Sequence, residues 1–175
     1  MILETDRLAL REVTHADLDF LAEMMADPEV MRYYPKVNTR DEVREWIGRQ
    51  FTRYAEHGHG IWLVLDRHAG HPVGRCGLAI QQVDDVPEPE IGYMIHRPFW
   101  RRGYATEAAL GVRRWAFEVK GLERVISLVR PENLPSQGVA RKLGMTPERE
   151  TEFFGLRHLV FAVRRADVNQ AMARG

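Results

Sequence analysis

The sequence predicts an α+β fold, because it contains both periodicities of regular structure. Segments in which apolar residues recur at three- and four-residue steps indicate helices, and short extended runs between Gly- and Pro-containing turns indicate strands. At the centre of the chain a strand, a helix, a second strand and a second helix follow one another, as in a βαβα passage. With 175 residues and 45% hydrophobic content, the chain can bury one substantial core, so we expect a single domain over 1–175.

The first third of the chain predicts one strand and two helices. Residues 7–11 alternate between apolar and polar as an edge strand does. Thr14 resembles the N-cap of a helix that runs to Met25. Asn38 or Thr39 can cap a second helix, which ends at the segment HGHG.

The remaining elements are predicted from runs of apolar residues and from turn signals. Extended runs predict an antiparallel meander of three strands, over 61–65, 73–80 and 90–95, with turns around Gly70 and Pro87. The spacing after that predicts a helix over 103–119, a strand over 125–129, a short helix over 136–143 and a last strand over 156–163.

Composition narrows the classes of partner. Lys plus Arg and Asp plus Glu both total 25, so no net charge favours nucleic acid or a membrane surface, and we expect neither as a partner. The first residues lack the basic flank and apolar block of a secretory signal, which leads us to expect a cytoplasmic protein. Cys76 is the only cysteine and the histidines at 57 and 59 are too few for a site, so we expect no metal.

One segment has the chemistry of an anion site. The strand EIGYMI leads through HRPF into WRRGYATEA, which opens a helix whose first N–H groups lack partners and carry the positive end of the helix dipole. Gly103 allows close approach of the backbone, Ala105 leaves the first turn unobstructed, and Arg101 and Arg102 supply charge. From these residues alone, a solvated turn before an ordinary helix is an equal alternative.

Two segments resemble motifs of GNAT acetyltransferases, in particular the branch that includes the RimJ and RimL ribosomal-protein N-terminal acetyltransferases. The cofactor motif of the family is Gln or Arg, two residues, Gly, one residue, then Gly or Ala. This chain has Trp100, Gly103 and Ala105, and Trp at the first position is similar to that branch. Further on, RPENLPSQGVARKLGM resembles the Asn-x-x-Ser motif with its Lys-Leu-Gly ending. TDRLALRE and RHLVFAVRRAD resemble the first and last strands, so the likeness covers nearly the whole chain.

The resemblance implies the GNAT fold, a central mixed and mostly antiparallel twisted sheet flanked by helices, and acetyl-CoA as acetyl donor. It also implies that the parallel strands 90–95 and 125–129 splay apart around the pantetheine arm, and that Arg101 to Thr106 surround the pyrophosphate. The residues implied in cofactor binding are Met94, Ile95, His96, Arg101, Arg102, Gly103, Tyr104, Ala105, Thr106 and Asn133.

The implied reaction is direct attack of an amine on the thioester, with a backbone N–H stabilising the oxyanion and no acyl-enzyme. Glu90, beside the cofactor, is the candidate proton acceptor, and a solvated carboxylate at the strand edge is the alternative. Ser136 is the candidate to hydrogen-bond the leaving thiolate or the cofactor, and a helix cap is the alternative.

The acceptor is left open by the sequence. A protein N-terminal α-amine, a small-molecule amine, or a non-catalytic acyl-CoA-binding module all fit the motifs. Asp84, Asp85, Glu88 and Glu90 form a local acidic cluster that would suit a basic N-terminal tail. Residues 33–35 (Tyr-Tyr-Pro) fall on the acceptor side, where substrate contact and hydrophobic packing are equal expectations. The branch often forms homodimers.

Overall fold

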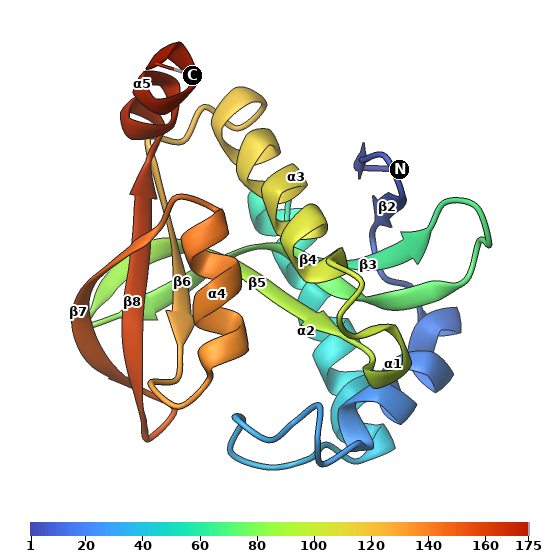
Figure 1. The fold of residues 1–175 in the computed structure, drawn as a ribbon. Coiled ribbons are helices and arrows are strands. Elements are labelled where there is room, and N and C mark those ends of the chain that lie inside the picture. The colour runs from blue at the N-terminus through green and yellow to red at the C-terminus, as the bar shows by residue number, and fades with distance from the viewer. Residues whose placement is uncertain (175) are drawn as a thin grey trace.

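The computed structural model describes residues 1–174 (Figure 1). The strands are β1 (Leu3–Glu4), β2 (Leu8–Arg11), β3 (Ile61–Asp66), β4 (Pro72–Val83), β5 (Val86–Ile95), β6 (Arg124–Val129), β7 (Thr146–Phe153) and β8 (Leu156–Arg164). The α-helices are α1 (Leu18–Ala26), α2 (Arg40–His57), α3 (Tyr104–Glu118), α4 (Leu134–Lys142) and α5 (Arg165–Arg174). No helix in this range is long and apolar enough to span a bilayer.

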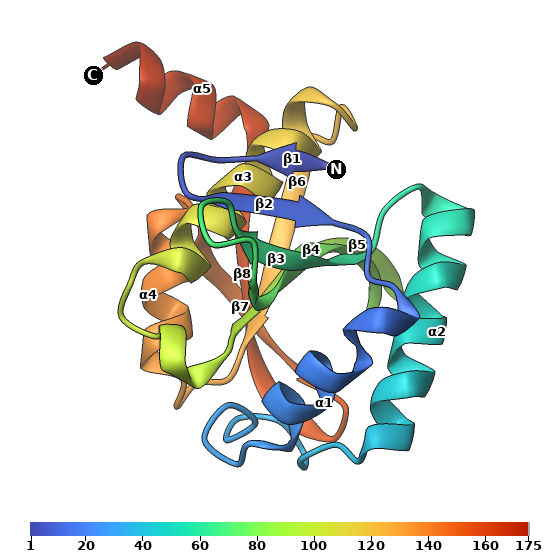
Figure 2. The same ribbon diagram turned by 90° about the vertical axis from the view of Figure 1, so that its right-hand side faces the viewer.

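All eight strands form one mixed sheet in the order β1-β2-β3-β4-β5-β6-β8-β7. Every neighbouring pair is antiparallel except β5 and β6, which run parallel. Figure 2 shows α1 and α2 together on one side of the molecule and α3 and α4 on the other. The predicted α+β class, the antiparallel meander β3-β4-β5 and the parallel pair that follows it are confirmed.

The sheet buries a different set of side chains on each face, as alternation along a strand requires. Trp62 on β3 and Cys76 on β4 point into the core beneath α3 and α4. Their neighbour Leu63 joins Met94 of β5 in the core beneath α1 and α2. Cys76 is fully buried, and burial raises the pKa of its thiol, so it packs as a small apolar residue.

The predicted starts of the first two helices are confirmed by their caps. Thr14 precedes a 3₁₀ turn that leads into α1, and its backbone N–H donates to the Asp17 carboxylate over 2.7 Å. Thr39 caps α2: its hydroxyl accepts from the Glu42 N–H at 3.3 Å, and its own N–H donates to the Glu42 carboxylate at 2.8 Å.

The predicted turn around Pro87 is wrong. The β4–β5 hairpin turns at Asp84 and Asp85, which have φ values of 51° and 63°, and Pro87 lies within β5 opposite Gln82. Because β6 joins β5 only at Glu90, the proline before that point lies on an open strand edge, where a missing N–H costs little.

Three elements were not predicted, namely β1, β7 and α5. The sequence of β7, TPERETEF, is mostly exposed and has no apolar alternation that would mark it. The predicted start of the helix at Ser136 is also corrected: α4 begins at Leu134, and Asn133 is its N-cap.

Candidate active site

The site lies at a fork between the two parallel strands. β5 and β6 share one paired position, Glu90 opposite Ile126. Beyond it, β5 continues to Ile95 and β6 to Val129 without another paired position. This divergence is the one expected for the strands that would hold a pantetheine arm.

The backbone at the end of β5 is partly engaged within the protein. The N–H of His96 donates to the Val73 carbonyl at 2.9 Å, and the His96 carbonyl accepts from the Phe99 N–H at 2.9 Å. His96 therefore has no free backbone N–H for a strand-like contact. The Ile95 carbonyl also accepts from the Trp100 indole at 2.7 Å, so the predicted backbone contacts to the cofactor rest on Met94 and on the Ile95 N–H.

The turn before α3 has the conformation of an anion site. Gly103 is the N-cap, with φ of 77°, and Arg101 before it also has a positive φ of 62°. No side chain caps the N–H groups of Tyr104, Ala105 and Thr106 in the part of the chain that the structure describes. The predicted pyrophosphate residues therefore gather around uncapped N–H groups at the positive end of a long helix.

Contacts that the sequence did not predict hold this helix start in place. The Glu107 carboxylate accepts from the Thr5 hydroxyl at 2.6 Å and from the Arg7 backbone N–H at 2.8 Å. The Tyr104 hydroxyl donates to Asp66 at 2.9 Å, and the Arg7 guanidinium lies 4.9 Å from the Tyr104 ring centroid. The first turn of α3 is thus tied to β3 and to the turn between β1 and β2.

On the α4 side of the fork, Asn133 and Ser136 have distinct roles. The Asn133 side-chain oxygen accepts from the Ser136 N–H at 3.1 Å, so Asn133 is the cap and Ser136 is not. The Ser136 hydroxyl lies 3.1 Å from the hydroxyl of Tyr93, which also donates to the Ser136 carbonyl at 2.9 Å. Tyr93 of β5 was not predicted as a site residue, and burial raises the pKa of its hydroxyl.

Glu90 lies on the opposite face of β5 from Tyr93, at the fork itself. Its Oε2 accepts from the Gln81 side chain at 2.8 Å, and its Oε1 accepts from the Leu128 N–H at 3.4 Å. Burial raises the pKa of the Glu90 carboxyl, although both hydrogen bonds oppose the rise. Glu90 is therefore a half-buried carboxylate held in place by two hydrogen bonds, and not a freely solvated one.

The other members of the predicted acidic cluster do not create an acidic cleft. Asp84 accepts from Arg149 at 2.9 Å and from the Thr151 hydroxyl at 2.6 Å. Glu88 accepts from Arg124 at 2.7 Å. Asp84 and Glu88 thus pair with side chains of β7 and β6, Asp85 is exposed in the hairpin turn, and Glu90 is the member of the cluster that lies at the fork.

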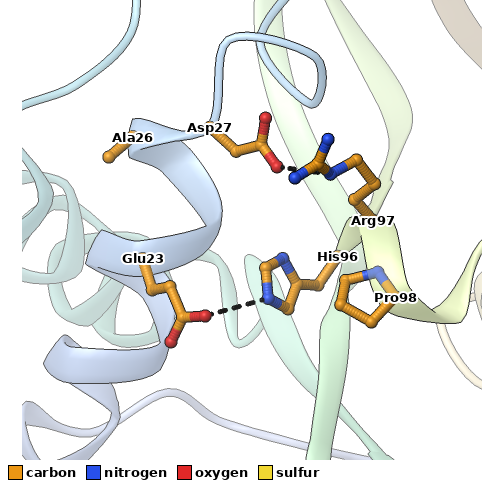
Figure 3. Close-up of a pocket in the computed structure, with 6 residues that line it drawn as sticks. All are labelled: Glu23, Ala26, Asp27, His96, Arg97 and Pro98. Carbon is orange, nitrogen blue, oxygen red and sulfur yellow. Dashed lines mark ion pairs between the residues drawn. The ribbon is translucent and has the colours of Figure 1, made fainter.

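A concavity of about 380 Å³ lies between α1 and the segment after β5 (Figure 3). Two ion pairs cross it: Glu23 to His96 at 3.4 Å, and Asp27 to Arg97 at 3.0 Å. Figure 3 shows Glu23 of α1 and Asp27, the residue that follows α1, pointing toward these basic partners. The ion pairs tie α1 to the end of β5.

A second concavity, of about 420 Å³, lies between the α1–α2 loop and the β6–α4 loop. Arg32 and Tyr33 line it on one side, and Arg130 and Glu132 on the other. Tyr33 is one of the aromatic residues predicted on the acceptor side. Within residues 1–174, no three His, Cys, Asp or Glu side chains gather closely enough to hold a metal ion.

Residues 7–146, which include the fork, the α3 turn and α4, match the family model described as "Acetyltransferase (GNAT) domain". The chain belongs to this family. Acetyl-CoA is the acetyl donor of GNAT enzymes, and the relatives support an N-acetyltransferase. YkkB of Bacillus subtilis (strain 168) is 34% identical over 144 residues, which are 82% of this chain and 84% of YkkB. The N-acetyltransferase YnaD of the same strain is 30% identical over 149 residues, 85% of this chain and 84% of YnaD.

Solved structures of GNAT acetyltransferases share the fold. The acetyltransferase from Agrobacterium tumefaciens str. C58 is 26% identical with a TM-score of 0.81, over 93% of this chain and 94% of that one. RimL, a ribosomal L7/L12 α-N-protein acetyltransferase, has a TM-score of 0.75 at 16% identity, over 93% of this chain and 97% of its own. Spermidine N-acetyltransferase from Vibrio cholerae also has a TM-score of 0.75 at 16% identity, over 93% of this chain and 98% of its own. These two have different acceptors, so the GNAT fold alone leaves the acceptor undecided.

Proposed function

We propose that this GNAT protein transfers the acetyl group of acetyl-CoA directly to a primary amine, with Glu90 as the proton acceptor. The observation that carries the proposal is the place of Glu90, at the one paired position of the parallel strands. Its two carboxylate oxygens are oriented by Gln81 and by the Leu128 N–H. A general base needs this combination of fixed position and access to the reacting atoms.

The donor side supports acetyl-CoA binding. The uncapped N–H groups at the start of α3 fit the pyrophosphate, and the left-handed Gly103 lets the chain turn beneath it. From there the pantetheine arm would pass between the end of β5 and α4, contacting Met94, Ile95 and Asn133. The thioester would then reach the fork, where Glu90 lies.

Ser136 is proposed to hydrogen-bond the leaving thiolate. Its hydroxyl already contacts the Tyr93 hydroxyl at 3.1 Å, and both groups lie on the α4 side of β5. The proposed base and the proposed thiolate partner therefore come from opposite sides of the fork. Such separation lets one group take the proton from the amine while the other stabilises the thiolate.

We propose an α-amine, such as a protein N-terminus, as the preferred kind of acceptor. An α-amino group with a pKa near 7.8 is roughly a tenth neutral at pH 7, whereas a lysine near 10.4 is neutral only about once in 2500 molecules. A single half-buried carboxylate at the fork is a modest base. Such a base suits an α-amine better than a lysine, because the α-amine loses its proton more readily.

We also propose a place in the RimJ/RimL-like branch and a cytoplasmic location. Trp100, at the first position of the cofactor motif, supports the branch. Its indole Nε1 donates to the Ile95 carbonyl at 2.7 Å and so joins the turn before α3 to the end of β5. The lone, fully buried Cys76 is consistent with a reducing compartment.

The proposal is tested by measuring release of free CoA thiol from acetyl-CoA with peptide N-termini, lysine peptides, polyamines and amino sugars. Transfer to α-amines in preference to lysine supports the proposal. Binding of acetyl-CoA without transfer to any amine would instead favour a non-catalytic acyl-CoA-binding module. Transfer to one small-molecule class alone would retain the activity and replace the acceptor.

A further inference from the structure

Arg75, in the middle of β4, is a buried cation whose guanidinium is incompletely satisfied. Its side chain is 9% exposed, and its Nε has no hydrogen-bond partner. Across residues 1–174, no carboxylate forms an ion pair with it. Its guanidinium lies 4.9 Å from the ring centroid of Trp46 on α2. A buried charge that is left unpaired is costly, so the position calls for a ligand anion.

Arg75 and Glu90 lie on the same face of the sheet. Arg75 is directly opposite Met94, and Ala79 is directly opposite Glu90. Since side chains alternate along a strand, Arg75, Met94 and Glu90 all point toward α1 and α2. The unpaired cation therefore lies on the face that carries the proposed base, and away from the α3 turn that would hold the cofactor phosphates.

The groups around Arg75 add to its positive charge. Arg53 of α2 is partly buried, burial lowers its pKa, and the charge of Glu90 opposes that change. Tyr34 is 43% exposed as a residue; desolvation of its hydroxyl raises the pKa of that group, and the charge of Arg75 and a hydrogen bond with Arg75 oppose the rise. The charges of two guanidinium groups thus act on the single carboxylate of Glu90, beside a tyrosine hydroxyl that can donate a hydrogen bond.

We propose that Arg75 binds an anionic group of the acceptor, so that the acceptor carries a carboxylate as well as the primary amine. The proposal rests on the proposed function, since it places the acceptor on the Glu90 side of the fork. The planar guanidinium can hold a carboxylate through two parallel hydrogen bonds, and the Tyr34 hydroxyl can donate a third. A polyamine has no such group, and the excess of positive charge at Arg53 and Arg75 would repel it.

The test compares amines that differ only in the anion. The acceptors are L-alanine, L-glutamate and γ-aminobutyrate, each beside its carboxamide, together with peptides that begin with Asp or Ala, and spermidine. CoA thiol release gives kcat/KM, and calorimetry on the complex with CoA gives the affinity of the same compounds. The proteins are the wild type, Arg75→Gln, Arg75→Lys and the control Arg44→Gln, whose exposed arginine lies elsewhere on α2.

The wild type should prefer the carboxylate to its carboxamide, and Arg75→Gln should reduce this preference by about tenfold to a hundredfold, the range for hydrogen bonds to charged groups. Arg75→Lys should restore part of it, and Arg44→Gln should retain it. Use of free amino acids would identify a small-molecule acceptor, and use of the Asp peptide alone would identify an acidic protein N-terminus.

Two outcomes would overturn the inference. The wild type could bind and acetylate each carboxylate and its carboxamide equally well. That result would support acetyl transfer but would show that the acceptor needs no anionic group. If Arg75→Gln lowers kcat/KM equally for the carboxylate and the carboxamide acceptors, Arg75 has a structural role and does not bind the acceptor. If no amine is acetylated, the proposed function fails, and calorimetry still decides whether Arg75 binds the acid.

Discussion

Gln81 on β4 and Glu90 on β5 are joined side chain to side chain, with Nε2 of Gln81 donating to Oε2 of Glu90 over 2.8 Å. The Leu128 N–H holds the other oxygen from β6 at 3.4 Å. The carboxylate is thus fixed by both strands that flank it. Burial raises its pKa, and the two hydrogen bonds limit that rise.

Replacing Glu90 with Gln should lower kcat/KM by about a hundredfold or more, the usual contribution of a general base. The wild-type rate, corrected for the fraction of neutral amine, should fall as the pH drops through the raised pKa of Glu90, because the base becomes protonated. Glu90→Gln should lack this acidic limb. Measurement of kcat/KM against pH checks both effects, with Glu88→Gln as a control carboxylate in the same strand. An unchanged profile in Glu90→Gln would remove Glu90 as the base.

Replacing Gln81 with Leu should move the acidic limb to higher pH. The Gln81 hydrogen bond favours the charged carboxylate, so its loss raises the pKa of Glu90 further. At alkaline pH, where Glu90 is charged in both proteins, the rates should agree within about twofold because the base itself is intact. Gln82→Leu, at an exposed neighbouring position, is the matched control. A limb that stays in place would mean that Gln81 does not tune the base.

Local signals predicted the starts of the first two helices and the α3 turn. Thr39 with Glu42, and Gly103 before an amphipathic helix, act through residues that are close in sequence, so the sequence alone is enough to find them. Asn133 was found as a motif residue, but its capping role became clear only when the start of α4 was known.

Residues that meet across strands could not be predicted in the same way. The contact of Gln81 with Glu90 and that of Tyr93 with Ser136 depend on strand register and on which face meets which helix. β4 is buried on both faces for most of its length, so alternation does not show that Arg75 points away from the larger core. A charged residue within an otherwise buried strand was the one available signal of a site.

The two roles of Asn133 can be separated by two substitutions. Asn133→Ala removes the cap of α4 and should cost about 1 kcal/mol, a fall in Tm of roughly 2–4 °C for a chain of this size. Asp caps as well as Asn, so Asn133→Asp should keep the Tm. Both variants should bind CoA more weakly, because neither has the side-chain amide that is proposed to meet the pantetheine arm. Normal CoA affinity in Asn133→Asp would leave Asn133 as a cap alone.

Gly103 offers the most direct test of the pyrophosphate site, because a second glycine provides a matched control. Gly103 and Gly155 have φ values of 77° and 70°, so alanine at either position is strained by roughly 1–2 kcal/mol. A Cβ at Gly103 would lie 3.5 Å from the Arg7 guanidinium, which is ordinary contact, and a Cβ at Gly155 would have no neighbour within 4 Å. Any difference between the variants therefore reflects the place of the turn and not crowding.

Both alanine variants should lose similar thermal stability, and only Gly103→Ala should also bind CoA more weakly, by about tenfold. The reason is that relief of the strain at Gly103 rotates the peptide groups that begin α3, whereas Gly155 lies in the β7–β8 turn and contributes no N–H group to the start of that helix. Thermal melts and calorimetric titration with CoA measure the two effects. Equal CoA affinity in the two variants would mean that the α3 turn does not hold the pyrophosphate.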